Sequence, residues 1–92
     1  MYIGRVIGTV VSTSKNELLI GMKFLIVERL SERLEREGSS EIAVDTVGAG
    51  NGELVIVTTG SSARYILRRG ADGTQPPVDK AIVGIIDTVE VG

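Results

Sequence analysis

The chain has no cysteine, no histidine and no tryptophan among its 92 residues. These absences exclude disulfides, and they exclude metal sites built from cysteine or histidine. They also exclude catalysis by a histidine base or a cysteine nucleophile, so that only Asp, Glu, Lys, Ser or Tyr remain for chemistry. A chain without cysteine suits a reducing compartment, and we expect the protein to be cytosolic.

Aromatic side chains and positive charge are also scarce. Aromatic residues make up 3% of the chain, and the formal net charge is −2. A barrel that binds single-stranded nucleic acid uses aromatic stacking platforms in a positively charged groove. The aromatic residues here are Tyr2, Phe24 and Tyr65, and Phe24 lies in an apolar run typical of a core strand. An OB-type nucleic-acid-binding module therefore remains only the alternative function, and we expect no nucleic-acid partner.

The chain also lacks a long apolar run. No stretch approaches the roughly 18 residues that a membrane-spanning helix needs, and residues 1–5 do not have the layout of a signal peptide. We therefore expect no membrane partner. What the chain does have is 42% hydrophobic residues, chiefly Val, Ile and Leu, which favour strands.

The length predicts a single domain over residues 1–92. A domain of this size buries only about 60–65% of the surface that its unfolded chain exposes, so its stability on its own is marginal. Disulfides and cysteine-based metal sites are excluded as supplements. Oligomerisation is the common supplement that remains, and we expect a homo-oligomer.

Apolar runs separated by glycine and polar turns predict five strands, over residues 1–12, 23–30, 41–47, 54–59 and 81–91. A short helix is predicted over residues 63–69, with Ser61 and Ser62 as its N-cap and Gly70 as its end. This pattern favours an all-β fold, a small five-stranded OB-like β-barrel with one short helix. The helix falls between the fourth and fifth strands, whereas the common OB order places it between the third and fourth.

Residues 31–40 form the ambiguous part of the pattern. Ser31 is placed to cap a short helix that carries Leu34 on one face and ends at Gly38. The alternative is a surface excursion between two strands, and a functional interpretation would make the segment an acidic and basic recognition surface. Glutamate and arginine alternate through the segment, and this favours a solvated surface.

The stretch from residue 45 to residue 64 organises the chain. Gly48, Gly50 and Gly52 occupy alternate positions, where glycine indicates positive φ or a close backbone approach. A dinucleotide-binding loop would be followed by a helix, but residues 54–59 predict a strand, and no Gly-Lys-Ser/Thr motif is present. We therefore expect a tight connection between two strands, able to take part in an oligomer contact, and no cofactor.

Asp45 and Glu53 flank this turn. One hypothesis is a carboxylate pair for acid–base catalysis. The favoured interpretation is structural: the two carboxylates accept hydrogen bonds from loop amides or pair with an arginine such as Arg64. No spacing typical of a calcium-binding loop is present, so we expect neither a metal site nor an enzyme.

Several motifs follow one another along nearly the whole chain. They are Gly4-Arg5-Val6-x-Gly8-Thr9-Val10-Val11, Lys23-Phe24-Leu25-Ile26-Val27, Asp45-x-x-Gly48-Ala49-Gly50-x-Gly52-Glu53, Gly60-Ser61-Ser62-Ala63-Arg64, Pro77-Val78-Asp79 and Ile82-Val83-Gly84-Ile85-Ile86-Asp87. In these motifs the chain resembles the EutN/CcmL family, the pentameric vertex proteins of bacterial microcompartment shells. The resemblance implies the same OB-like barrel.

The resemblance also implies a structural function. Five copies would form a ring that caps the vertices of a polyhedral shell in the bacterial cytoplasm, with hexameric shell proteins as partners. Two loop segments are then expected near subunit contacts or the central axis, with the residues Asp45, Gly48, Ala49, Gly50, Gly52, Glu53, Gly60, Ser61, Ser62, Ala63 and Arg64. Residues 31–40 and 71–78 are candidates for the outer rim. Because a Cβ at a position of positive φ costs about 1–2 kcal/mol, Gly50→Val is expected to impair assembly.

Overall fold

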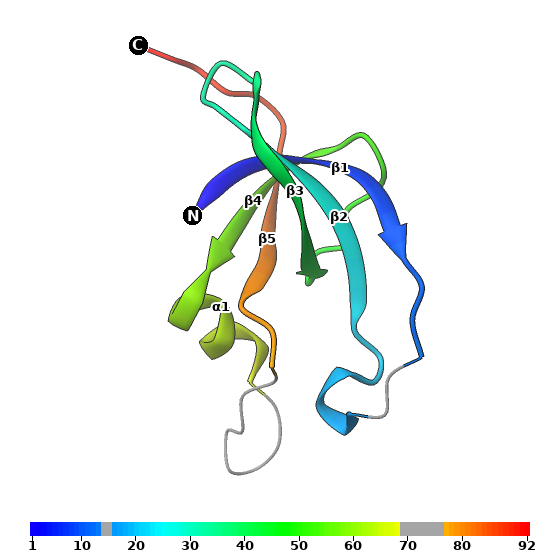
Figure 1. The fold of residues 1–92 in the computed structure, drawn as a ribbon. Coiled ribbons are helices and arrows are strands. Elements are labelled where there is room, and N and C mark those ends of the chain that lie inside the picture. The colour runs from blue at the N-terminus through cyan, green and yellow to red at the C-terminus, as the bar shows by residue number, and fades with distance from the viewer. Residues whose placement is uncertain (14–15, 69–76) are drawn as a thin grey trace.

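The computed structural model describes residues 1–13, 16–68 and 77–92. In chain order its elements are β1 (Tyr2–Val10), the 3₁₀ helix η1 (Glu17–Leu19), β2 (Lys23–Leu30), β3 (Arg36–Asp45), β4 (Leu54–Thr59), α1 (Gly60–Leu67) and β5 (Lys80–Ile86) (Figure 1). Strands dominate, as expected for a chain rich in Val and Ile. The prediction of an all-β fold with one short α-helix is confirmed.

The five strands close into a barrel in the order β1-β2-β3-β5-β4. Neighbouring strands are antiparallel, except that β3 and β5 are parallel where Val44 pairs with Ala81 and Asp45 with Ile82. β1 closes the barrel because it pairs with β2 along one edge and with β4 along the other. Each strand therefore has two neighbours, and the predicted OB-like barrel is confirmed.

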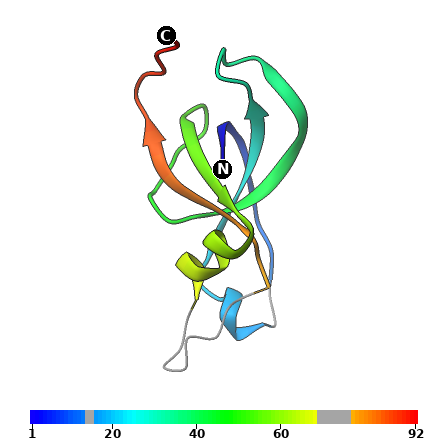
Figure 2. The same cartoon turned by 90° about the vertical axis from the view of Figure 1, so that its left-hand side faces the viewer.

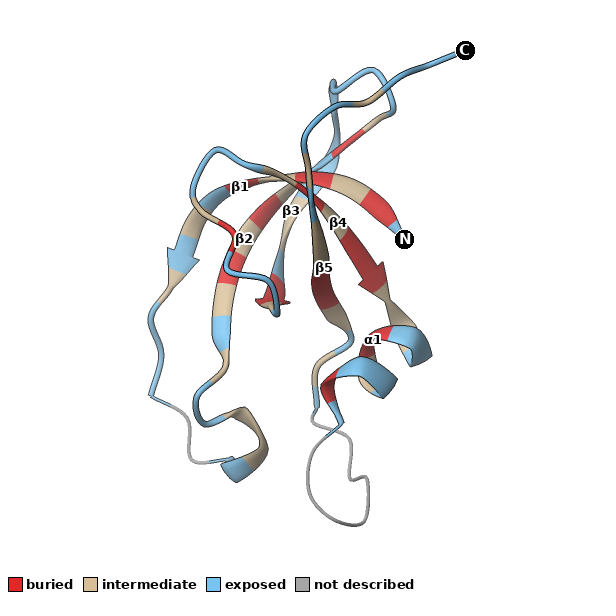
Figure 3. Cartoon of the chain, turned by 180° about the vertical axis from the view of Figure 1, so that it is seen from behind, coloured by how far each residue is buried: buried red, intermediate tan, exposed pale blue. Residues whose placement is uncertain are grey.

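The core of the barrel consists of branched aliphatic side chains. Successive side chains of a strand face opposite sides, so alternate residues point inward. The red bands in Figure 3 mark these buried positions along the strands. The largest fully buried side chains are Val6, Leu25, Val27, Val55, Val57 and Ile82.

The helix α1 covers the end of the barrel at which β4 ends and β5 begins (Figures 1 and 2). Its buried residues, Ala63 and Leu67, are four positions apart and therefore lie on one face of the helix. They pack with Val44 and Ala81 in a second apolar cluster. Phe24, expected in the core, is partly buried against this cluster.

Residues 31–35 form the turn of a β-hairpin and residues 36–40 form the start of its second strand, β3, so the predicted short helix is wrong. The backbone N–H of Ser31 donates to the carbonyl of Glu35 at 2.9 Å, which closes the turn between β2 and β3. The Ser31 hydroxyl accepts hydrogen bonds from the amides of Arg33 and Glu35, and such local bonds compete with a helix. The alternative, a surface excursion, is confirmed, since the hairpin projects from one end of the barrel beside the C-terminus (Figures 1 and 2).

The start of α1 differs from the prediction. The helix begins at Gly60, and Ser61 and Ser62 lie exposed in its first turn instead of capping it. The residue at the N-cap position is Thr59, whose side chain makes no capping hydrogen bond. The N–H of Gly60 instead donates to the carbonyl of Asp79 at 2.9 Å, so a tertiary contact holds the start of the helix. The predicted helix end at Gly70 lies outside the described residues.

The bounds of β2 and β4 agree with the prediction, whereas β3 begins earlier and β5 ends earlier. β3 starts at Arg36 because it pairs with Leu30 directly beyond the turn. β5 stops at Ile86 because this residue pairs with Leu54, the first residue of β4. Without a partner strand beyond that point, the apolar Val91 is left exposed.

Gly4 lies where β1 passes closest to the core. A Cβ added there would overlap Cγ1 of Val27, which is fully buried and packed on all sides. We expect Gly4→Ala to lower the free energy of unfolding by about 1–3 kcal/mol, measured by urea denaturation. Gly8→Ala is the matched control, because its Cβ would meet only the tip of the half-buried Ile26, at 3.3 Å. Equal losses in the two variants would contradict this account.

Candidate functional site

The loop between β3 and β4 is shaped by the carboxylate of Asp45, the last residue of β3. Its Oδ1 accepts hydrogen bonds from the amides of Val47 and Gly48 at 3.0 and 3.1 Å, and its Oδ2 accepts one from Ala49 at 3.0 Å. The side chain is only 2% exposed, and the Lys23 ammonium lies 3.8 Å from Oδ2. Three amides and one cation thus compensate a carboxylate that the fold has removed from water.

Glu53 completes the loop from its other end. Its Oε1 accepts a hydrogen bond from the amide of Gly50 at 2.6 Å. The two carboxylates therefore bind the amides of residues 47–50, which are consecutive in the chain. This confirms the interpretation that Asp45 and Glu53 accept hydrogen bonds from loop amides. The alternative pairing is wrong, because neither forms an ion pair with Arg64 among the described residues.

Backbone hydrogen bonds tie this loop to β1. The amide of Gly52 donates to the carbonyl of Val6 at 2.7 Å, and the amide of Val6 donates to the carbonyl of Glu53 at 3.0 Å. The guanidinium of Arg5 adds a bond to the carbonyl of Gly52 at 3.3 Å. The loop is therefore a fixed part of the barrel wall.

Two of the three alternating glycines adopt positive φ. Gly48 has a φ of 79° and Gly52 a φ of 88°, and both belong to the left-handed region that favours glycine. Gly50 is not among the residues of positive φ, so the reason given for an effect of Gly50→Val is wrong. Its amide donates a hydrogen bond to Oε1 of Glu53, and a Cβ added at Gly50 would lie 3.1 Å from that oxygen.

The two predicted site segments lie apart within one subunit. Residues 48–52 precede β4 and residues 60–64 follow it, so the length of this strand, about 20 Å for six residues, separates them. Ala49 and Ala63 are buried in the subunit's own core. Ser61 and Ser62 are exposed, and Arg64 is half-buried.

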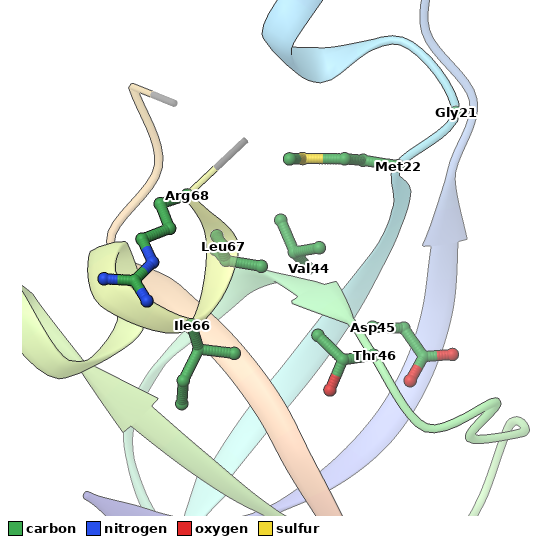
Figure 4. Close-up of a pocket in the computed structure, with 8 residues that line it drawn as sticks. All are labelled: Gly21, Met22, Val44, Asp45, Thr46, Ile66, Leu67 and Arg68. Atoms are coloured by element: carbon green, nitrogen blue, oxygen red, sulfur yellow. The ribbon is translucent and has the colours of Figure 1, made fainter. Parts of the chain in front are cut away.

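A hollow that the sequence did not indicate lies between the end of α1 and the start of the loop that follows β3. Its volume is about 230 Å³. The residues that line it come from the turn before β2, from the end of β3 and from the end of α1 (Figure 4). They are Gly21, Met22, Val44, Asp45, Thr46, Ile66, Leu67 and Arg68. The Asp45 carboxylate is already occupied by loop amides. The guanidinium of Arg68 stacks over the ring of Tyr65, 3.8 Å from its centroid. The hollow therefore presents an apolar floor with a polar edge and no general acid–base pair.

A second polar group joins side chains of β1, β3 and β5. Oε2 of Glu41 accepts a hydrogen bond from the Tyr2 hydroxyl at 3.4 Å and lies 3.3 Å from the ammonium of Lys80. Burial and the negative charge of Glu41 raise the pKa of Tyr2 to about 12. Burial acts to lower the pKa of Lys80, but the contacts with Glu41 and Asp79 outweigh it and raise that pKa. Both groups therefore keep their protons at neutral pH.

The described part of the chain provides neither a cluster of metal ligands nor a membrane-spanning helix. Its acidic residues form no group of three or more that could hold a metal ion. No helix in residues 1–13, 16–68 and 77–92 is long and apolar enough to cross a membrane.

Comparison with known proteins decides the family. The sequence model of the family described as "Ethanolamine utilisation protein EutN/carboxysome" matches residues 1–87. The chain belongs to the EutN/CcmL family.

Individual members of the EutN/CcmL family match the chain over nearly its full length. GrpN of Rhodospirillum rubrum strain F11, a bacterial microcompartment shell vertex protein, is 61% identical over 90 residues, which cover 98% of this chain and 97% of GrpN. CcmL of Thermosynechococcus vestitus, a carboxysome shell vertex protein, is 51% identical over 89 residues, covering 97% and 86%. The solved structure of GrpN, described as a pentameric microcompartment shell protein, has a TM-score of 0.84 at 58% identity and covers 100% of this chain and 99% of that one.

These relatives bear directly on the predicted function. They are named as shell vertex proteins of microcompartments and carboxysomes, and none of their names is that of an enzyme. The predicted EutN/CcmL resemblance and the structural, non-enzymatic role are confirmed. The alternative, an OB-type nucleic-acid-binding module, is not favoured by any of these relatives.

The first prediction from this site concerns Asp45. Asp45→Asn replaces one accepting oxygen with an NH₂ group, which would face the amides that the carboxylate now binds. We expect the free energy of unfolding to fall by about 1–3 kcal/mol in thermal or urea denaturation. Glu53→Gln is the matched control, since its remaining carbonyl oxygen still accepts the single bond from Gly50. A loss for Glu53→Gln as large as that for Asp45→Asn would count against this role of Asp45.

The second prediction separates the glycines by their backbone conformation. Gly52→Ala places a Cβ at a φ of 88° and is expected to cost about 1–2 kcal/mol of stability. Gly50→Ala needs only a small shift of the exposed Glu53 side chain and is expected to cost less. The comparison is made by urea denaturation of both variants, and a larger cost at Gly50 would refute it.

Proposed function

We propose that five copies of this EutN/CcmL chain close a ring that occupies the vertices of a bacterial microcompartment shell. The observation that carries the proposal is the near-complete match to GrpN, whose structure is that of a pentameric shell protein. We also propose that residues 1–92 act as one domain, with the barrel as the repeating unit of the ring. Such a unit has to be rigid and requires no catalytic group.

The physical basis of the proposal is curvature. Hexagonal tiles lie flat and do not enclose a volume by themselves, whereas tiles of five-fold symmetry at the corners supply the missing curvature. A ring forms when one surface of each subunit contacts a different surface of the next and the rotation closes. The closed barrel gives each subunit a fixed shape, so the angle between its two contact surfaces is fixed as well.

We propose hexameric shell proteins as the neighbours of this ring. The hairpin formed by residues 31–40 is the favoured rim element, because it projects from the barrel and residues 32–39 are exposed. Its alternating glutamates and arginines suit polar contacts that repeat on five sides. Of the other candidate, residues 71–78, only Pro77 and Val78 lie within the described residues.

The two loop segments are proposed to lie near subunit contacts or the central axis. Gly48, Gly52, Ser61 and Ser62 are exposed and accessible to a neighbouring copy. Since β4 separates the segments in one subunit, a contact between them requires two copies. Asp45 and Ala63 support this arrangement from inside, by fixing the loop and the helix.

The proposal is tested by native mass spectrometry and by electron microscopy. At micromolar concentration the purified chain is expected to have the mass of a pentamer. Shells assembled with the chain are expected to close and to exclude a large probe, whereas shells assembled without it are expected to stay open at their corners. A monomer as the only species, or equally closed shells in its absence, would show that the vertex role is wrong.

A further inference from the structure

The outer face of the β2–β3 pair carries two neighbouring apolar cross-strand pairs, and the helix α1 covers only one of them. Phe24 and Val44 are cross-strand partners and lie under the cluster that α1 builds. Ile26 and Ile42 form the next outward-facing pair along the same strands. Ile42 is 55% exposed, although it stands in the middle of a strand of the barrel.

This uncovered part of the face is hollowed. A depression of about 610 Å³ is lined by Ile26, Ser40, Glu41, Ile42 and Lys80. A second depression of about 200 Å³ shares Ile42 and Lys80 with the first and extends toward Phe24 and Val78. We call the two together the Ile42 hollow. Its shape and its apolar floor suit the insertion of side chains from another molecule.

The charges at the edge of the Ile42 hollow are already paired. The ammonium of Lys80 lies 3.3 Å from Glu41 and 3.5 Å from Asp79, and Glu41 also accepts the Tyr2 hydroxyl. Side chains of Lys80 and Glu41 are only 29% and 28% exposed. A molecule that covers the hollow therefore removes water from a charge pair that keeps its partners, and leaves no isolated charge behind.

We propose that a second copy of this chain docks on the Ile42 hollow, and that Ile42 is an anchor of the subunit contact in the ring. This inference rests on the proposed pentamer. A contact that closes a ring joins two different surfaces, so the hollow of one copy receives another part of the next copy. Each subunit then has one hollow covered and covers one in turn.

A second copy fits the hollow better than a transient partner does. Interfaces of permanent oligomers are more apolar at their centre than transient ones, and charged residues stand at their rim. The hollow combines the same two kinds of residue, the apolar Ile26 and Ile42 and the paired charges of Glu41 and Lys80. The charged hairpin of residues 31–40 has the opposite character and suits a neighbouring tile.

The test compares two substitutions of the same kind. Ile42→Glu places a charge in the hollow, whereas Ile20→Glu places it on a side chain of similar exposure, 59% against 55%, beside η1. Native mass spectrometry over a dilution series is expected to show that Ile42→Glu raises the concentration at which the ring dissociates by at least about tenfold. Ile20→Glu is expected to dissociate like the unchanged chain, and circular dichroism is expected to show a folded barrel for both.

Each outcome of this test supports or contradicts either the ring itself or the proposed contact at Ile42. An unchanged chain that is monomeric contradicts the proposed function and this inference together. A pentamer that is equally stable with Ile42→Glu overturns the inference and leaves the ring standing, and so does equal weakening by both glutamates. If Ile42→Glu does not fold, Ile42→Ala decides the matter: the inference predicts a weaker ring of folded subunits, and an unchanged dissociation midpoint refutes it.

Discussion

The barrel depends on a short parallel contact between β3 and β5. Only two residue pairs define it, Val44 with Ala81 and Asp45 with Ile82. Thr46 extends it, because its amide and its hydroxyl both donate to the carbonyl of Ile82, at 3.3 and 2.6 Å. The other neighbouring strands share longer ladders. We call this contact the β3–β5 seam, and the barrel cannot close without it.

The loop and the helix are both attached to the β3–β5 seam. Asp45 is a member of the seam, and its carboxylate arranges the loop that follows. The buried face of α1, with Ala63 and Leu67, packs on Val44 and Ala81 and so covers the seam. A change in the loop or in the helix therefore affects the contact that closes the barrel. For a shell protein this coupling has a clear use, because a tile with a rigid outline holds its neighbours at a constant angle.

The same strands that build the core also explain why the subunit needs neighbours. Inward residues of β2 and β3, such as Leu25, Val27 and Ala43, are buried by the fold itself. The outward residues Ile26 and Ile42 are apolar as well, and the fold does not cover them fully. A small barrel has too few elements to shield both faces of its sheet. In the proposed ring, association with further copies supplies the missing cover.

Local patterns predicted several elements well. The bounds of β2 and β4 follow from runs of apolar residues between polar or glycine-containing turns, which is information contained in the segments themselves. The predicted cap at Ser61 and Ser62 was wrong because a residue distant in sequence, Asp79, binds the first amide of the helix. The role predicted for Gly50 was wrong for a different reason: its φ is not positive, and its backbone amide donates a hydrogen bond to the Glu53 side chain.

The sequence by itself determined the class of the protein: a small aliphatic β-barrel with glycine-shaped loops, without the histidines and cysteines that many enzymes use, and with the motifs of EutN/CcmL. These properties are local or compositional, and a linear chain displays them directly. Only the tertiary structure decided that Asp45 binds three loop amides, that α1 covers the β3–β5 seam, and that Ile42 lies in an uncovered hollow. Each of these depends on which strands become neighbours, and strand order is settled by the packing of the whole barrel.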